Sequence, residues 1–162
     1  MIINYLSIVF STIFGTLLHF TYEWSNKNKL VGLFSATNES TFEHIKMGIN
    51  GRLLVLPVEV HLLGHYPNYY LSVLIEILLI PIFIILFFYG YQLIFKKANM
   101  VYDILIFYIS ILLSYFIGFK VLYNLKASIF SIHAYTLISI ILLIEICLTI
   151  KPLKIFLFRI SN

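Results

Sequence analysis

Residues 70–95 read YLSVLIEILLIPIFIILFFYGYQLIF, and this stretch decides the fold class of the chain. It carries a single charged residue, Glu76, in a run dominated by Ile, Leu and Phe. A helix that crosses a bilayer needs about 20 mostly apolar residues, so the stretch is long enough to span one. Pro81 does not argue against this assignment, because membrane helices tolerate a proline kink.

The composition extends this interpretation to the whole chain. Of 162 residues, 61% are apolar and only 11% are charged, whereas soluble domains carry about 25% charged residues. Too little polar surface remains to cover a water-soluble globule. We therefore expect an all-α polytopic bundle that forms a single transmembrane domain over residues 1–162, with the lipid bilayer as its partner. The net charge of +4 is small and spread along the chain, which argues against a nucleic-acid partner.

Five transmembrane helices are expected, at residues 2–22, 40–63, 70–95, 101–123 and 128–150. The second is the least apolar, because it contains several ionisable side chains and is interrupted by Pro57. We expect it to start in the headgroup region, where Ser40 and Glu43 match a capping box, and to dip into or cross the membrane. The tail at 153–160 alternates basic and bulky apolar residues, which predicts a segment lying along the interface.

The positive charges predict the orientation of these helices. With five spans, one side of the membrane holds Lys27, Lys29, Lys96, Lys97, Lys151, Lys154 and Arg159, and the other holds only Lys120 and Lys126. The positive-inside rule then places the N-terminus outside and the C-terminus in the cytoplasm. The frequent use of Ile, Phe, Tyr, Lys and Asn is typical of AT-rich bacterial genomes, and it predicts a multi-pass protein of the bacterial cytoplasmic membrane.

Polar residues gather where the first two helices approach the predicted cytoplasmic side. In the first helix a small-to-polar stripe recurs every four residues and ends at His19 and Glu23. On the second helix Glu43, Lys46 and Asn50 fall within about 60° of one another, since successive residues are rotated by about 100°. The two groups flank one short loop. The spacing predicts a site formed by His19, Glu23, Glu39, Glu43 and His44, together with Lys46.

Several roles fit this set of side chains. Carboxylates and imidazoles suit a divalent metal such as zinc, manganese or iron, and the candidate metal ligands are Glu39, Glu43, His44 and His19. The same groups suit proton transfer or the binding of a polar head group. In the structural alternative, Glu43 caps its helix, Glu39 and Lys46 are solvated, and His19 bonds a neighbouring helix.

The remaining polar side chains have simpler interpretations. His61 and His65 are four residues apart, but Gly64 is expected to end the helix between them and leave both exposed. Glu76 is expected to hydrogen-bond another helix or to be protonated, and Glu145 to reach toward the interface near Lys151. The row Ser110, Ser114 and Gly118 is typical of close helix packing, and Asp103 suits a helix N-terminus. Cys147 lies alone in an apolar run, where a buried structural thiol is expected.

Two runs of the chain resemble a known family. Residues 15–25, GTLLHFTYEWS, and residues 37–46, TNESTFEHIK, are similar to the signature of small bacterial multi-spanning membrane proteins of unknown function. That signature is LHF-x-Y-x-W-S followed by PVNES-x-WEH-x-K. Here Ala36 and Thr37 replace the Pro-Val pair, and Phe42 replaces the second tryptophan. The resemblance implies several further spans and no assigned activity. It implies that the signature residues are His19, Glu23, Asn38, Glu39, Ser40, Glu43, His44 and Lys46.

The function expected from these observations is not enzymatic. The chain contains no HExxH, GxSxG or P-loop motif. We expect a membrane protein whose polar site, at the cytoplasmic boundary of the first two helices, binds or passes a small ion or polar ligand or docks a partner. The alternatives are a metal-dependent membrane enzyme acting on a lipid or peptide, and a structural subunit of a membrane complex or homo-oligomer.

Overall fold

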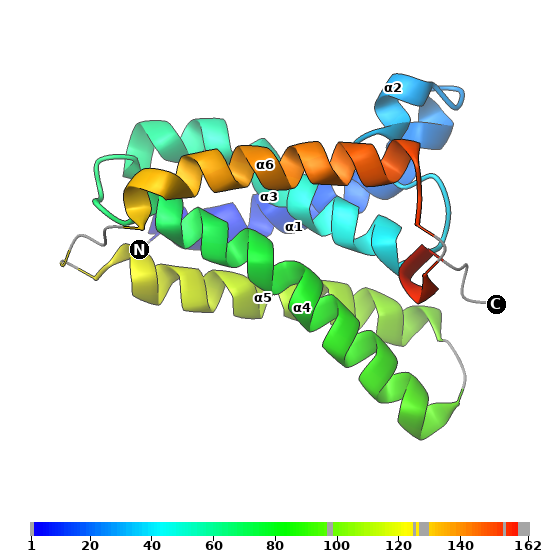
Figure 1. Cartoon of the computed structure of the whole chain (residues 1–162). Helices are drawn as coiled ribbons and strands as arrows, with labels where there is room; N and C mark the ends of the chain where they lie inside the picture. Colours follow the sequence, from blue (N-terminus) through cyan, green and yellow to red (C-terminus); the bar gives the residue numbers. More distant parts are fainter. Residues whose placement is uncertain (1, 97–98, 125, 127–129, 154, 159–162) are drawn as a thin grey trace.

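The computed structural model describes residues 2–96, 99–124, 126, 130–153 and 155–158. The elements, in chain order, are α1 (Ile2–Trp24), α2 (Lys29–Gly32), α3 (Thr41–Leu63), α4 (Tyr69–Phe95), α5 (Met100–Leu122), α6 (Ser131–Ile150) and the 3₁₀ turn η1 (Phe156–Phe158). The five long helices run along one another in a bundle (Figure 1). The helical fold class is confirmed, and the helix ends fall within a few residues of the predicted ones.

Four of the long helices have the length and apolar composition to cross a membrane. These are α1, α4, α5 and α6. The 23 residues of α3 are long enough to span a bilayer, but this helix carries buried charged side chains at several positions. A fifth span at α3, and the predicted orientation of the termini, therefore stay predictions.

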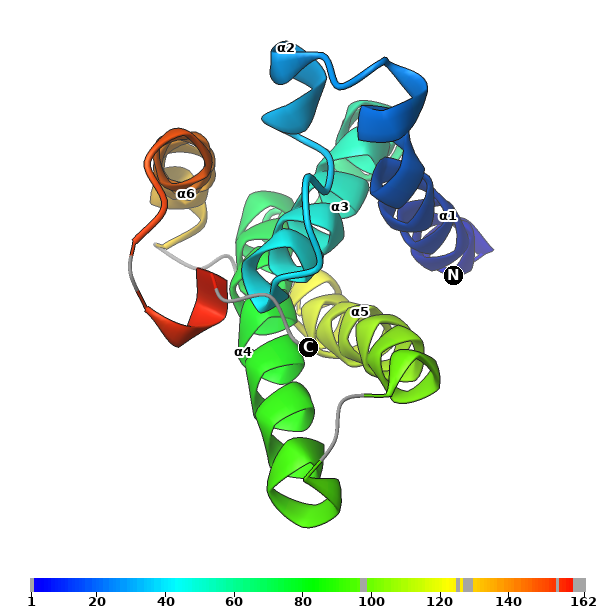
Figure 2. The same cartoon turned by 90° about the vertical axis from the view of Figure 1, so that its right-hand side faces the viewer.

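The helix α3 occupies the middle of the bundle. Seen along the helices, α3 lies between α1, α4 and α5, while α6 packs on the other side of α4 (Figure 2). The outer faces of the surrounding helices are apolar: Phe10 on α1, Leu86 on α4 and Leu112 on α5 are all exposed. Buried charges with apolar side chains around them are the reverse of a soluble domain, and they suit a bundle surrounded by lipid.

Small residues allow α1 and α3 to approach closely. The buried face of α1 consists of Asn4, Ser7, Ser11 and Gly15. A Cβ atom added at Gly51 of α3 would lie 2.6 Å from the Ser11 carbonyl oxygen. Small residues at helix interfaces let two backbones pack in contact inside a membrane.

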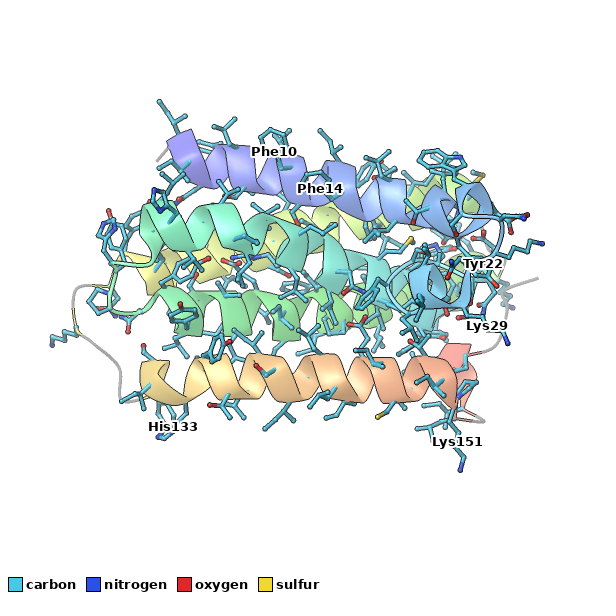
Figure 3. All side chains as sticks on the ribbon, turned by 90° about the horizontal axis from the view of Figure 1, so that it is seen from above. Phe10, Phe14, Tyr22, Lys29, His133 and Lys151 are labelled. Atoms are coloured by element: carbon cyan, nitrogen blue, oxygen red, sulfur yellow. The ribbon has the colours of Figure 1, made fainter. Side chains whose placement is uncertain are left out.

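The ends of the bundle agree with five helices that alternate in direction. Lys29 and Lys151 lie at one end of the bundle, whereas His133 lies at the other (Figure 3). Phe10 and Phe14 project from the outer side of α1 in the same view. The short helix α2, which the sequence pattern did not predict, lies in the loop between α1 and α3.

The described part of the C-terminal tail packs back onto the bundle. The rings of Phe158 in η1 and Phe42 at the start of α3 stack with their centroids 4.4 Å apart. Residues 154, 159 and 160 of the predicted interfacial tail lie outside the described residues.

Candidate functional site

The six residues that the spacing predicts as one site occupy three separate places. Glu23 is on the surface, where its carboxylate lies 3.6 Å from the Lys27 ammonium one turn further on. Glu43 and Lys46 are buried beneath the loop that precedes α3. His19, Glu39 and His44 lie around a cavity between α1, α3 and α5. Asn38 and Ser40 belong to the loop that connects these places.

Glu43 fastens this loop to α3. Its carboxylate accepts hydrogen bonds from the backbone N–H of Thr37, at 2.9 Å, and from the Thr37 hydroxyl, at 3.2 Å. The predicted capping box is wrong, because the Ser40 side chain makes no cap hydrogen bond. In a capping box the Glu43 side chain would accept a hydrogen bond from the backbone N–H of Ser40. This N–H instead donates to Asn38 Oδ1 at 2.9 Å, and Glu43 accepts from Thr37.

Lys46 is fully buried, which corrects the expectation that it is solvated. Its ammonium lies 2.7 Å from the Glu43 carboxylate and donates to the Gly32 carbonyl oxygen at 3.0 Å. A buried ammonium needs such partners, because removing it from water is costly. The pair therefore ties the end of α2 to the first turns of α3.

A further buried contact joins α3 to α6. Asn50 Nδ2 donates to Glu145 Oε1 at 2.6 Å and to the Phe34 carbonyl oxygen at 3.1 Å. The expectation that Glu145 reaches toward Lys151 is wrong, since Glu145 is only 5% exposed. Its carboxyl group points into the bundle, where it accepts the hydrogen bond from Asn50 of α3.

The cavity that contains His19, Glu39 and His44 has a volume of about 540 Å³. Its polar lining comprises Thr16, His19, Glu39, His44, Asp103 and Tyr108. Its apolar lining comprises Gly15, Phe20, Met47, Met100, Ile104 and Phe107. These residues come from α1, the loop before α3, α3 itself and α5, and we call the space the α1–α5 cavity.

Local contacts fix the polar groups of the α1–α5 cavity. His19 Nε2 lies 3.5 Å from Glu39 Oε1, with 30% of the His19 side chain and 61% of the Glu39 side chain exposed. The His44 ring nitrogen Nδ1 lies 3.0 Å from the Ser40 carbonyl oxygen. The two imidazole rings are 6.4 Å apart. Asp103, in the first turn of α5, accepts a hydrogen bond from the Tyr91 hydroxyl at 2.5 Å.

The arrangement does not gather the candidate metal ligands. Glu43 is engaged with Thr37 and Lys46, away from His19, Glu39 and His44. Across the part of the chain that the structure describes, no three His, Cys, Asp or Glu side chains are grouped so that they could hold a metal ion. Among the described residues, the four candidate metal ligands are therefore not brought together.

Sequence reasoning missed a second buried group, formed by Arg52, Glu59 and Glu76, which we call the Arg52 cluster. The Arg52 Nη2 atom lies 2.7 Å from Glu59 Oε2, and Nε donates to Glu76 Oε2 at 2.5 Å. The Arg52 guanidinium also lies over the Tyr115 ring, 4.9 Å from its centroid. Glu76 is thus an interhelical partner, as one of its two interpretations predicted.

A signal for the Arg52 cluster was present in the sequence. Arg52 lies 11 residues before the end of α3 at Leu63, and Glu76 lies 7 residues after the start of α4 at Tyr69. In an antiparallel hairpin these positions differ in height by about one helical turn, which a long arginine side chain covers. Opposite charges in neighbouring membrane helices tend to pair. The relative positions of Arg52 and Glu76 in the α3–α4 hairpin would therefore have predicted this ion pair.

Three simpler predictions have clear outcomes. His61 and His65 are exposed and Gly64 ends α3 between them, as predicted. Ser110 and Ser114 are buried, and Gly118 packs directly against the Glu76 side chain, so the small row is a packing surface. Cys147 is exposed, which corrects the prediction of a buried thiol. An apolar stretch in a lipid-facing helix does not require its cysteine to face inward.

Comparison with known proteins identifies the family. No curated protein and no solved structure is significantly similar to the chain. A family of membrane proteins was expected from the two signature runs, and a family described as of unknown function matches residues 2–162. The chain, a helical bundle with four helices apolar enough to cross a membrane, therefore belongs to the family of unknown function DUF6512.

Proposed function

We propose that this chain is a membrane protein that binds a small organic cation with an apolar body in the α1–α5 cavity. The observation that supports this most is the charge of the cavity lining. It includes the carboxylates of Glu39 and Asp103, and none of the described Lys or Arg residues lines it. A positively charged ligand would be attracted there, whereas an anion would be repelled.

The walls of the cavity favour an organic cation over a small inorganic one. Phe20, Phe107 and Tyr108 present aromatic rings to the cavity, and Met47 and Ile104 add apolar surface. Cations are attracted to the faces of aromatic rings, which are used in proteins to bind quaternary ammonium groups. The volume of about 540 Å³ lies within the range of about 300–1,000 Å³ that is typical of small-molecule sites.

The place of the cavity in the membrane supports the same function. It lies near the end of α1 and the beginnings of α3 and α5, which the positive-inside rule assigns to the cytoplasmic side. The two imidazoles and the hydroxyls of Thr16 and Tyr108 supply hydrogen-bonding groups that orient the ligand. An amphipathic cation in the inner leaflet would reach these groups from the lipid or from the cytoplasm.

Binding of ethidium, a fluorescent aromatic cation, tests this function. Fluorescence anisotropy would be measured on the protein in lipid nanodiscs, with empty nanodiscs subtracted. Replacing a charged partner in a partly exposed site removes about 1 kcal/mol, or about fivefold in affinity. We therefore expect Glu39→Gln and Asp103→Asn each to weaken ethidium binding about fivefold.

The matched control is Glu23→Gln, which removes the same charge from α1 outside the cavity. We expect this variant to bind ethidium as the wild type does. Equal affinity in all four proteins, or an equal loss in Glu23→Gln, would show that ethidium binds through general surface charge and would overturn the proposed function.

A further inference from the structure

The Arg52 cluster lies entirely inside the bundle. Arg52 is 1% exposed, Glu59 is 2% exposed and Glu76 is fully buried. The three side chains come from two helices, α3 and α4, and the Tyr115 ring of α5 covers the guanidinium. In a bundle that lies in a membrane, charges at this depth are costly and are found mainly where they pair or serve a function.

The charges of the Arg52 cluster do not balance. One guanidinium faces two carboxyl groups, so the cluster would carry a net negative charge if both carboxyl groups were ionised. The other groups in contact are neutral: the Tyr69 hydroxyl donates to Glu59 at 3.1 Å, and the Ser72 hydroxyl donates to Glu76 at 3.1 Å. The contacts of the described residues bring no second cation from α1 or α6.

The hydrogen bonds of Arg52 are also incomplete. Nε donates to Glu76 and Nη2 pairs with Glu59, whereas Nη1 is buried without a hydrogen-bond partner. Arginine often binds a carboxylate through two parallel N–H groups. Here each carboxylate receives one nitrogen, and the buried Nη1 is a donor that neither carboxylate uses.

We propose that the Arg52 cluster binds one exchangeable proton inside the membrane bundle. The proton, taken from water, bonds to a carboxylate oxygen of Glu59 or Glu76 and makes the cluster electrically neutral. Glu59 and Glu76 share the one guanidinium, which can balance the charge of only one of the two carboxylates. The titratable groups around the proton are Arg52 and Glu59 of α3, Tyr69 and Glu76 of α4 and Tyr115 of α5. This site is independent of the α1–α5 cavity.

Proton binding predicts the direction in which stability changes with pH. Over a range of pH the folded protein would hold a proton that the unfolded chain, with solvated carboxylates, has already released. Stability then falls as pH rises, because the folded state binds more protons than the unfolded state. Glu59→Gln and Glu76→Gln each replace one carboxylate by a neutral amide of similar shape, so each variant should no longer need the proton.

The first test compares the melting temperature of the full chain in lipid nanodiscs from mildly acidic to alkaline pH. We expect the wild type to lose melting temperature as pH rises, and Glu59→Gln and Glu76→Gln to lose clearly less. Glu23→Gln is the control, because it removes a surface carboxyl group outside the Arg52 cluster and should keep the pH dependence of the wild type. If both single variants follow the wild type at every pH, the proposal is wrong.

A second measurement tests the proposal even if Glu59→Gln or Glu76→Gln fails to fold. The infrared carbonyl stretch of a protonated carboxyl group would be followed as pH rises in Glu145→Gln, which lacks the buried carboxyl group of α6. We expect a band that is lost at alkaline pH and whose midpoint does not depend on sodium. Absence of such a band, or a melting temperature that rises with sodium and not with protons, would overturn the proposal in favour of fixed ion pairs or a bound metal cation.

Discussion

At the scale of single residues, the two cations of α3 illustrate why charge placement matters in this chain. Lys46 pairs with Glu43, and Arg52 pairs with Glu59 and Glu76, all inside the bundle. Removing one partner of a buried pair leaves the other charge uncompensated, which commonly costs about 3–5 kcal/mol. The pair at Lys46 is the simpler case, because it contains one cation and one carboxylate in direct contact.

We expect Lys46→Met to lower the free energy of unfolding by about 3 kcal/mol, because Glu43 then stays buried without its cation. The double variant Lys46→Met/Glu43→Gln should recover part of that loss. Unfolding in mixed micelles, followed by circular dichroism, measures both values.

Lys27→Met provides the control, since Lys27 pairs with Glu23 on the surface, where ion pairs contribute about 1 kcal/mol or less. If Lys46→Met is no more destabilising than Lys27→Met, the buried pair does not hold the loop and α3 together as described.

Which residues share a buried helix face was predicted from the sequence better than what those residues contact. The spacing named Glu43, Lys46 and Asn50 as one polar face of a helix, and these three side chains are buried together. Their partners were not predictable, because Thr37, Gly32 and Glu145 reach them through a loop and a distant helix. Helical periodicity fixes which residues share a face, but not what packs against that face.

At the scale of elements, the close approach of α1 and α3 fixes the position of α3 in the bundle. Ser11 and Gly15 of α1 face Gly51 of α3, and a Cβ atom at Gly51 would meet backbone atoms of both. Backbone atoms cannot move aside as the end of a flexible side chain can. The helix α3, with its charges, is held where it is by this contact and by its packing on α4.

We therefore expect Gly51→Ala to destabilise the protein, with a melting temperature lower by several degrees. Gly90→Ala in α4 is the matched control, because a Cβ atom there would meet nothing within 4 Å. In that variant the higher helix propensity of alanine, about 1 kcal/mol, should leave the melting temperature equal or slightly higher. Equal melting temperatures for the two variants would contradict the close contact between α1 and α3.

Helix positions were predictable because apolar runs of spanning length are a strong signal. The short helix α2 gave no such signal, since its four residues are too few for a periodic pattern. The central position of α3 was also not predictable from its own pattern. In its first half the polar and the apolar face are both buried, whereas Leu54 and Val58 of its second half are exposed. Amphipathicity alone suggests a helix that lies at a surface along its whole length.

At the scale of the whole molecule, both proposed sites depend on α3 crossing the bilayer. The α1–α5 cavity lies at its first turns, and the Arg52 cluster lies along its middle and second half. The start of α1 and the end of α6 lie at opposite ends of the bundle (Figure 3), as five alternating spans require. If α3 did not cross, the loop holding Lys29 and the loop holding Lys126 would lie on the same side of the membrane.

Labelling of single cysteines from one side of the membrane tests this most directly. Cys147 would first be replaced by serine, because it is exposed on α6, and Lys29→Cys or Lys126→Cys then introduced. A maleimide that cannot cross membranes would be added to intact cells. We predict that the cysteine at position 126 reacts from outside and the one at position 29 reacts only after permeabilisation. Reaction of both cysteines from the same side would contradict a spanning α3 with its charges inside the bilayer.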